Sequence, residues 1–137
     1  MNIDSITNGI VIDHIAKGRG MELYSLLGLD SLDCSVALIR NVASSKLGKK
    51  DIIKLDADIP VSFDVIGYVD PGITVNILRD GEIVEKRTIA PPEILKNVIK
   101  CKNPRCITTV EQGLDHIFKR VGDDGVYRCI YCEAKAK

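Results

Sequence analysis

The chain has 137 residues, of which 45% are hydrophobic and 28% are charged, a composition typical of a globular protein. Its 19 Lys and Arg residues balance its 19 Asp and Glu residues, which argues against a protein that binds nucleic acid through a net positive charge. No apolar run reaches the roughly 20 residues that a membrane helix needs, and no signal peptide is visible. We therefore expect a cytoplasmic protein that binds neither nucleic acid nor membrane.

The first strand is predicted at residues 9–15, where β-branched residues follow a glycine. Side chains alternate between the two faces of a strand. One face would carry Ile10, Ile12 and His14, and the other would carry Val11, Asp13 and Ile15. Asp13 is thus predicted to share a face with apolar neighbours.

Periodicity and turn signals predict two helices and four more strands. The first helix is expected at residues 21–28, with leucines at helical spacing and Gly28 as its stop. Ser62 is a candidate N-cap for the second helix, at residues 62–69. Asp80 and Gly81 lie between two β-rich runs and indicate a hairpin. The further strands are expected at residues 34–42, 50–55, 73–78 and 82–89.

The predicted order is strand, helix, strand, strand, helix, strand, with one added strand, which is typical of a ferredoxin-like α/β sandwich. Two helices would cover one face of an antiparallel sheet. Pro91 and Pro92 interrupt the pattern, because proline cannot continue a β-ladder. The sequence thus predicts an α+β protein with this sandwich in residues 1–95 and a small antiparallel β domain in residues 96–137, whose four cysteines are typical of a zinc ribbon.

Four cysteines near the C-terminus form two close pairs, Cys101 with Cys106 and Cys129 with Cys132, separated by 22 residues. Two short loops of this kind can present four sulfurs about 2.3 Å from one Zn²⁺. The alternatives are two disulfides or a redox dithiol. Zinc is favoured, because nothing directs the chain to an oxidising compartment and no strand-to-helix context surrounds the second pair. Four thiolate ligands leave no open position for a catalytic water, so the zinc would be structural.

Few other residues suggest catalysis. His14 and His116 are the only histidines, and no Ser/His/Asp or Cys/His arrangement is supported by sequence spacing. The fifth cysteine, Cys34, lies in an apolar run and is expected to be a small buried side chain.

Basic residues gather on two of the predicted strands. Lys50 and Lys54 share a face by alternation, with Lys49 beside them, and Lys86 and Arg87 lie on another strand. Two such lysines could converge on a phosphate. The alternative is that they are solvated residues of strand edges, where lysine discourages pairing with other chains. No glycine-rich phosphate loop decides between these interpretations.

Four features in order along the chain resemble the regulatory chain of aspartate carbamoyltransferase. They are the sequence VIDHI at residues 11–15, GKKDIIK at residues 48–54, TVN at residues 74–76 and the spacing of the two cysteine pairs. The resemblance covers essentially the whole chain.

The resemblance implies that the N-terminal domain is an allosteric domain that binds nucleotides. Asp13 matches an aspartate that hydrogen-bonds the nucleotide, Lys54 a lysine near the ribose and phosphate, and Lys86 a phosphate-binding lysine. His14 and Lys50 match nearby positions of the effector pocket. The other implied contacts are the backbone of Ile3, Asp4, Ser5 and Ile6, which would read the base, and Thr74, Asn76 and Ile83, which would line the pocket.

The resemblance also implies that the chain is a regulatory subunit without catalytic activity, acting in pyrimidine biosynthesis. Its effectors would be CTP, ATP and UTP. The zinc domain would dock on a separate catalytic chain, and the N-terminal domains would pair two regulatory chains into a dimer. Asn103, Arg105 and Glu133 are expected at the interface with the catalytic chain.

Overall fold

The computed structural model describes residues 6–45, 48–122 and 125–136. The chain divides into two compact units, Met1–Ala90 and Pro91–Lys137. They are called the first and second unit below.

The first unit is built on a five-stranded antiparallel sheet in the order β2-β3-β1-β4-β5. Its strands are β1 (Gly9–Ala16), β2 (Val36–Ser44), β3 (Gly48–Leu55), β4 (Thr74–Arg79) and β5 (Glu82–Thr88). β1 lies at the centre, whereas β2 and β5 are the edges. With the helices between the strands, this order is that of a ferredoxin-like sandwich extended by a fifth strand, so the predicted fold class is confirmed.

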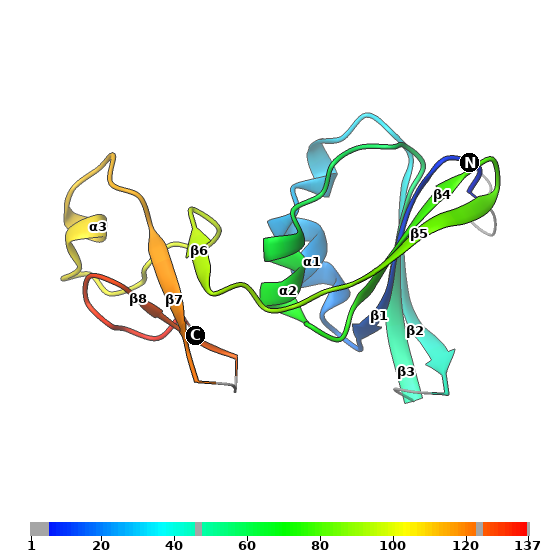
Figure 1. Cartoon of the computed structure of the whole chain (residues 1–137). Coiled ribbons are helices and arrows are strands. Elements are labelled where there is room, and N and C mark those ends of the chain that lie inside the picture. The colour runs from blue at the N-terminus through cyan, green and yellow to red at the C-terminus, as the bar shows by residue number, and fades with distance from the viewer. Residues whose placement is uncertain (1–5, 46–47, 123–124, 137) are drawn as a thin grey trace. The chain divides into compact units, whose positions relative to one another are not determined.

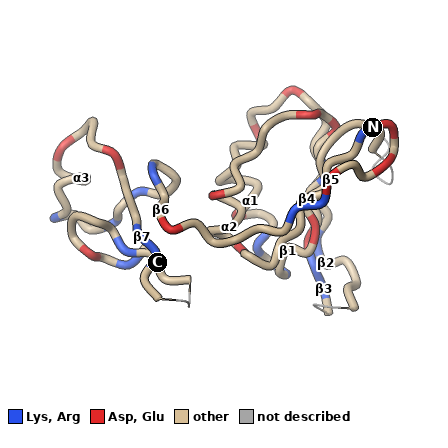
Figure 2. The backbone as a smooth tube through the Cα atoms, viewed as in Figure 1, with Lys and Arg blue, Asp and Glu red and all other residues tan. Residues whose placement is uncertain are grey.

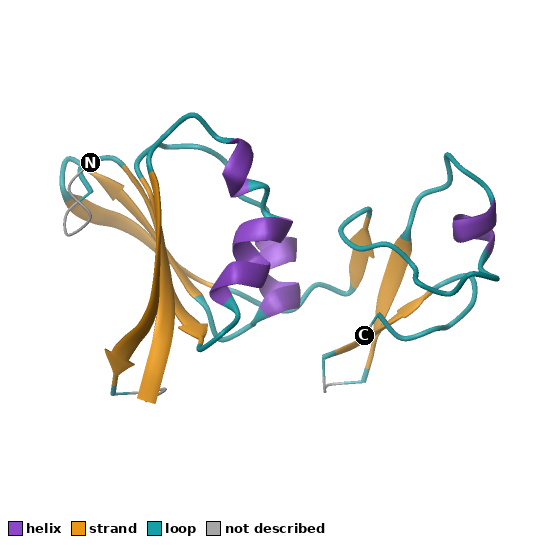
Figure 3. Ribbon diagram, turned by 180° about the vertical axis from the view of Figure 1, so that it is seen from behind, coloured by secondary structure: helices purple, strands orange, loops and turns teal. Residues whose placement is uncertain are grey.

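Helices α1 (Gly20–Leu26) and α2 (Phe63–Val69) cover one face of the sheet, and a short 3-10 helix, η1 (Leu29–Ser31), follows α1 (Figures 1 and 3). The hydroxyl of Ser62 accepts a hydrogen bond from the Val65 N–H at 3.3 Å, which confirms the predicted N-cap. Sheet residues under the helices form the core, where Ile10, Ile12, Ile53, Leu55 and Val75 are at most 3% exposed. The other face of the sheet, which carries Val11, Lys54 and Asn76, is called the open face.

The β4–β5 hairpin turns at the two residues that the sequence indicated. Asp80 and Gly81 have φ angles of 53° and 79°, in the left-handed region that this kind of two-residue turn requires. Element ends differ from the predicted ends by a residue or two. The strand expected at residues 34–42, for example, is Val36–Ser44.

A bulge in β1 overturns the predicted alternation of its side chains. The register with β3 shifts between Ile12 and Ile15, and His14 takes a φ of 61°. The extra residue returns Ile15 to the helix-covered face, where it is fully buried with Ile10 and Ile12. Asp13 and His14 are only half-buried. The prediction that Ile15 shares a face with Asp13, and His14 with Ile12, was wrong because strict alternation carries no signal for a bulge.

The second unit contains a three-stranded antiparallel sheet of β6 (Ile94–Lys96), β7 (Ile117–Val121) and β8 (Val126–Cys129), with one short helix, α3 (Ile107–Val110). Its small core includes Leu95, Phe118 and Tyr127, each at most 2% exposed. The Tyr127 hydroxyl donates to the carbonyl of Pro92, which ties the start of the unit to its sheet. The predicted domain boundary after residue 95 lies inside β6, a strand that pairs with β7 of this unit.

Among the described residues, none of the helices combines the length and apolar content that a membrane crossing requires.

Candidate functional site

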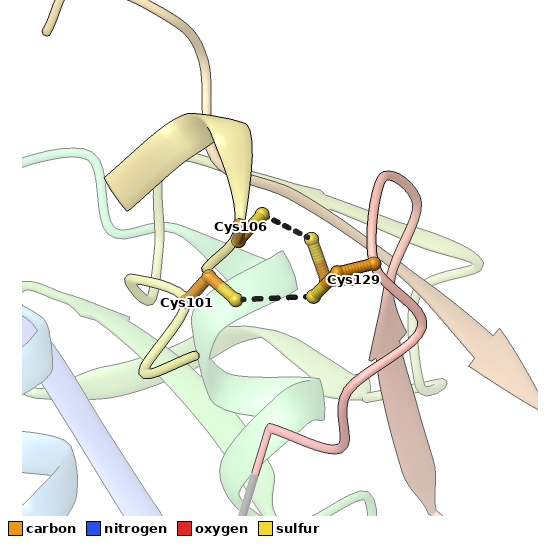
Figure 4. A group of neighbouring side chains, drawn as sticks. Cys101, Cys106 and Cys129 are labelled. Atoms are coloured by element: carbon orange, nitrogen blue, oxygen red, sulfur yellow. Dashed lines mark hydrogen bonds between the residues drawn. The ribbon is translucent and has the colours of Figure 1, made fainter. Parts of the chain in front are cut away.

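The four predicted metal ligands converge in the second unit. Figure 4 labels three of them, Cys101, Cys106 and Cys129, whose side chains point toward one another. Their Sγ atoms all lie within 4.8 Å of one another, with 3.5 Å between Cys101 and Cys132 and 3.7 Å between Cys106 and Cys129. All four are free thiols, so the disulfide alternative does not hold. Four sulfurs bound tetrahedrally to zinc would be about 3.8 Å apart, given bonds of about 2.3 Å. The arrangement therefore fits one tetrahedral metal ion.

Residues outside the cysteine motif support the cluster. The Nδ1 atom of His116, next to β7, accepts a hydrogen bond from the Cys101 N–H at 3.2 Å. The hydroxyl of Thr108 lies 3.0 Å from the Cys106 Sγ. Sequence reasoning missed both roles. Thr108 follows Cys106 closely enough to suggest a contact, but His116 comes near Cys101 only through the fold.

Local contacts shift the pKa values of the four thiols in opposite directions. Burial raises the pKa of Cys101 to about 12 and also raises the pKa of Cys129. The N–H of Ala134 lowers the pKa of Cys132 to about 6, and the Thr108 hydroxyl lowers the pKa of Cys106. A divalent cation would hold all four as thiolates, because a coordinated thiol loses its proton.

The loops that carry the cysteines also carry the residues expected at a partner interface. Asn103 is half-buried, and its Oδ1 accepts from the Arg105 N–H at 3.0 Å. Arg105 and Glu133 are exposed, and Glu133 has a φ of 65° in the turn that follows Cys132. Apolar side chains beside the cysteines are also exposed, by 46% to 69%: Ile107, Val110, Ile130 and Tyr131.

In the first unit, a row of residues crosses the open face of the sheet. Lys54 pairs with Val11, Val11 with Asn76, and Asn76 with Lys86. Directly opposed residues share a face of the sheet, so Lys54 on β3 and Lys86 on β5 lie at the two ends of this row. Figure 2 shows basic positions on these strands. Because β3 is an interior strand, the edge-strand alternative does not hold for Lys50 and Lys54.

An ion pair lies next to this row at the β1 bulge. The Nζ of Lys50 is 2.9 Å from the Oδ1 of Asp13, and the two side chains are 16% and 20% exposed. The same oxygen accepts the His14 N–H at 2.6 Å. Burial by itself would raise the pKa of Asp13, but the hydrogen bonds from Lys50 and His14 outweigh it and hold that pKa below its usual value.

Two buried polar atoms of predicted site residues have no hydrogen-bond partner within the described structure. They are the Nδ1 of His14, at the bulge, and the Oδ1 of Asn76, in the middle of the row. Buried polar groups are nearly always paired in folded proteins. These two atoms therefore mark the place on the sheet where a polar ligand would have groups to satisfy.

The other predicted site residues occupy varied positions. Thr74 is buried and pairs with Asp13, whereas Ile83 is 58% exposed on β5. Ile6 is 5% exposed, and the carbonyl of the next residue, Thr7, accepts the Gly81 N–H at 2.9 Å, so this segment runs beside the β4–β5 turn. Ile3, Asp4 and Ser5 lie outside the described residues.

Comparison with known proteins agrees with this two-part organisation. Two protein-family models match the chain. Residues 1–90 match the allosteric domain of the aspartate carbamoyltransferase regulatory chain, and residues 93–137 match the metal binding domain of the same chain. The chain belongs to the aspartate carbamoyltransferase regulatory chain family. The resemblance recognised in the sequence is thereby confirmed.

Curated relatives match over almost the full chain. Regulatory chains of aspartate carbamoyltransferase from Clostridium botulinum and Clostridium tetani are each 48% identical across 97% of this chain, and the match covers 92% and 94% of those proteins. That of Bifidobacterium longum is 42% identical across 100% of this chain and 99% of its own length. Members of the family are regulatory chains, with allosteric and metal-binding domains in place of a catalytic one, and the name implies a catalytic chain as partner.

The metal cluster predicts a strict dependence of the second unit on its cysteines. Cys106→Ser should abolish stoichiometric metal binding and unfold this unit, because its small core depends on the ion. Atomic absorption would measure metal per chain, and near-ultraviolet circular dichroism would report packing around Tyr127. Cys34→Ser is the matched control, since Cys34 lies in the first unit outside the cluster. Full metal content in the Cys106→Ser chain would contradict the assignment.

The Asp13–Lys50 pair predicts a specific pH dependence. Because the folded-state pKa of Asp13 lies below its ordinary 3.8, the pair stabilises the first unit above that pH and stops doing so as pH falls through the folded-state value. Lys50→Met should raise the pKa of Asp13, since burial then acts with less opposition. A ¹³C NMR titration of the Asp13 carboxyl measures this. Lys49→Met should leave it unchanged, and an unchanged value in Lys50→Met would refute the pairing.

Proposed function

We propose that the first unit binds the nucleoside triphosphates CTP, ATP and UTP on its open face, and that this binding regulates a catalytic chain. The row from Lys54 to Lys86 is the observation that carries the proposal. It sets two ammonium groups on either side of two uncharged residues, Val11 and Asn76, on the face of the sheet opposite the described helices α1 and α2.

The charges in this region suit the polyphosphate of a nucleotide. A triphosphate brings three to four negative charges, and lysines act on it as point charges. Lys54 and Lys86 would attract the phosphates, whereas the carboxylate of Asp13 would repel them and accept hydrogen bonds from neutral donors such as ribose hydroxyls. Lys50 already neutralises much of that carboxylate, which lets Asp13 remain close to an anionic ligand.

The base and sugar need fixed polar partners. The buried Oδ1 of Asn76 and Nδ1 of His14 offer an acceptor and a second polar group beside the row. The carbonyl of Thr7, just before β1, accepts the N–H of Gly81 in the β4–β5 turn. The main-chain groups of Ile3, Asp4, Ser5 and Ile6 would read the edge of the base. Thr74 and Ile83 would complete the lining.

In the second unit we assign the metal as zinc, one ion per chain. Four sulfur ligands in a tetrahedral arrangement suit zinc, and a site with all four positions filled by the protein is structural. No other role is assigned to the ion, because it would have no open position for a substrate.

Docking on the catalytic chain is assigned to the metal-bearing end of the second unit. Ile107 and Val110 of α3 and Ile130 and Tyr131 between the last cysteines expose apolar surface there. Such a cluster beside polar residues is typical of a protein interface. Asn103, Arg105 and Glu133 would form its polar contacts.

The remaining parts of the assignment concern assembly and location. An exposed edge strand such as β5 has unpaired backbone groups that can pair with another chain, which suits a dimer of regulatory chains. The protein would act in the cytoplasm, in pyrimidine biosynthesis. Regulation requires the nucleotides to discriminate between two quaternary states, with a coupling free energy of about 1–3 kcal/mol.

Nucleotide binding can be tested by isothermal titration of the zinc-loaded chain with ATP and CTP. Lys54→Met and Lys86→Met should each weaken binding about tenfold, which corresponds to about 1.4 kcal/mol, while zinc content is unchanged. Lys119→Met controls for the loss of one positive charge, because Lys119 lies on β7 of the second unit. Equal weakening in all three variants would indicate nonspecific attraction and refute the site.

The docking surface can be tested by co-expression with the catalytic chain and size-exclusion chromatography. Ile107→Asp should prevent co-elution while leaving zinc content intact, because a charge would be buried at the contact. Val121→Asp is the control, since Val121 is 45% exposed against 47% for Ile107 but lies away from the cysteine loops, on β7. Co-elution of the Ile107→Asp chain would place the interface elsewhere.

A further inference from the structure

Asp51 is a buried carboxylate that neither the metal cluster nor the open-face site uses. It is fully buried, on the helix-covered face of β3. Its Oδ2 accepts the N–H groups of Gly18 and Gly20 at 3.2 and 3.0 Å, and its Oδ1 accepts the Asn41 N–H at 3.1 Å. All three donors are main-chain groups. A buried carboxylate held in this way anchors backbone segments to one another.

The three donors come from the two sides of β3, two from the segment that follows β1 and one from β2. Gly18 lies in the connection from β1 to α1, Gly20 is the first residue of α1, and Asn41 lies in the bulge of β2, where the register with β3 shifts between Ile39 and Val42. Asn41 has a φ of 61°, the same left-handed angle as His14 in the β1 bulge. Asp51 therefore stands level with two bulges, one on each side of its strand.

The fit around Asp51 is close. A Cβ atom added at Gly20 would lie 2.8 Å from the Asp51 Oδ2 and 2.8 Å from the Leu38 Cδ1. Glycine is thus needed at position 20 for the backbone to approach the carboxylate. The connection after β1 is held against β3 with little freedom to shift.

Asp51 also adjoins the ion pair of the open face through the backbone. Lys50 precedes it on β3 and points to the opposite face, where its Nζ meets Asp13. Across the β1–β3 ladder, Asp51 pairs with Ile15, immediately after the bulge that contains Asp13 and His14. From the helix-covered face, the carboxylate thus holds together β1 and β3, the two strands that carry Asp13 and Lys50.

We propose that Asp51 is a positioning residue for the effector site: by fastening the β1–α1 connection and the β2 bulge to β3, it sets the geometry of Asp13, His14 and Lys50 on the other face. The proposal rests on the proposed function of that face as a nucleotide site. It makes the affinity for nucleotide depend on a carboxylate that no nucleotide can touch.

The decisive variant is Asp51→Asn, which keeps the side-chain size but presents an NH₂ group to N–H donors. Titration of the zinc-loaded full chain with ATP and with CTP should show about tenfold weaker binding. In a Lys50→Met background the same change should cost less than about twofold, because the geometry that Asp51 supports has already lost its ion pair. Ile66→Val, which removes a buried methyl from α2, controls for general destabilisation and should leave affinity unchanged.

Two further measurements keep the outcome decisive. Gly20→Ala displaces the same carboxylate without removing its charge and should weaken binding in the same direction, so it replaces Asp51→Asn if that chain does not fold. The ¹H–¹⁵N NMR spectrum without nucleotide should show shifts of the Asp13 and His14 amides in Asp51→Asn and not in Ile66→Val. Because this spectrum is recorded without nucleotide, it tests the positioning role independently of the nucleotide site. A wild-type chain that binds neither ATP nor CTP would refute the nucleotide site alone. Unshifted amides, unchanged affinity in Asp51→Asn, or an equal loss in the Lys50→Met background would each overturn the positioning role.

Discussion

The antiparallel pairing of β1 with β3 is the constraint on which the first unit depends. Ile12 and Ile53, opposed across this ladder, are fully buried under the helices, while Val11 and Lys54, one residue along, lie opposed on the open face. A shift of register by one residue would exchange these sets and bury a lysine against the helices. The apolar core and the basic row of the open face are therefore two consequences of the same pairing.

The bulge in β1 adds a second level of control. It costs one regular pairing and places His14 in a backbone conformation that non-glycine residues seldom adopt. The same bulge places Ile15 in the core and leaves the Asp13 carboxylate within 2.9 Å of the Lys50 Nζ. Irregular strand geometry of this kind tends to occur beside functional sites, because it aims side chains that a regular strand would turn away.

The second unit reaches stability by different means. Three short strands and one short helix bury few large side chains, so apolar burial alone would leave the unit marginal. One metal ion held by the four sulfurs would join the loop before α3 to the turn after β8, next to exposed apolar residues such as Val110. Because such an end is already rigid, its surface can bind a partner without the entropic cost of becoming ordered on contact.

The sequence by itself determined the fold class, the grouping of the four cysteines, the hairpin turn at Asp80 and the Ser62 cap, because each depends on local spacing or on residue types with one dominant use. It also placed Lys50 and Lys54 on one face, since alternation holds along β3. Only the tertiary structure decided that β3 is interior, that Lys54 and Lys86 flank one row, and that His116 supports Cys101. Those relations join residues far apart in the chain. The bulge at His14 and the three donors of Asp51 depend on strand register and backbone conformation, which a single sequence does not display as a pattern.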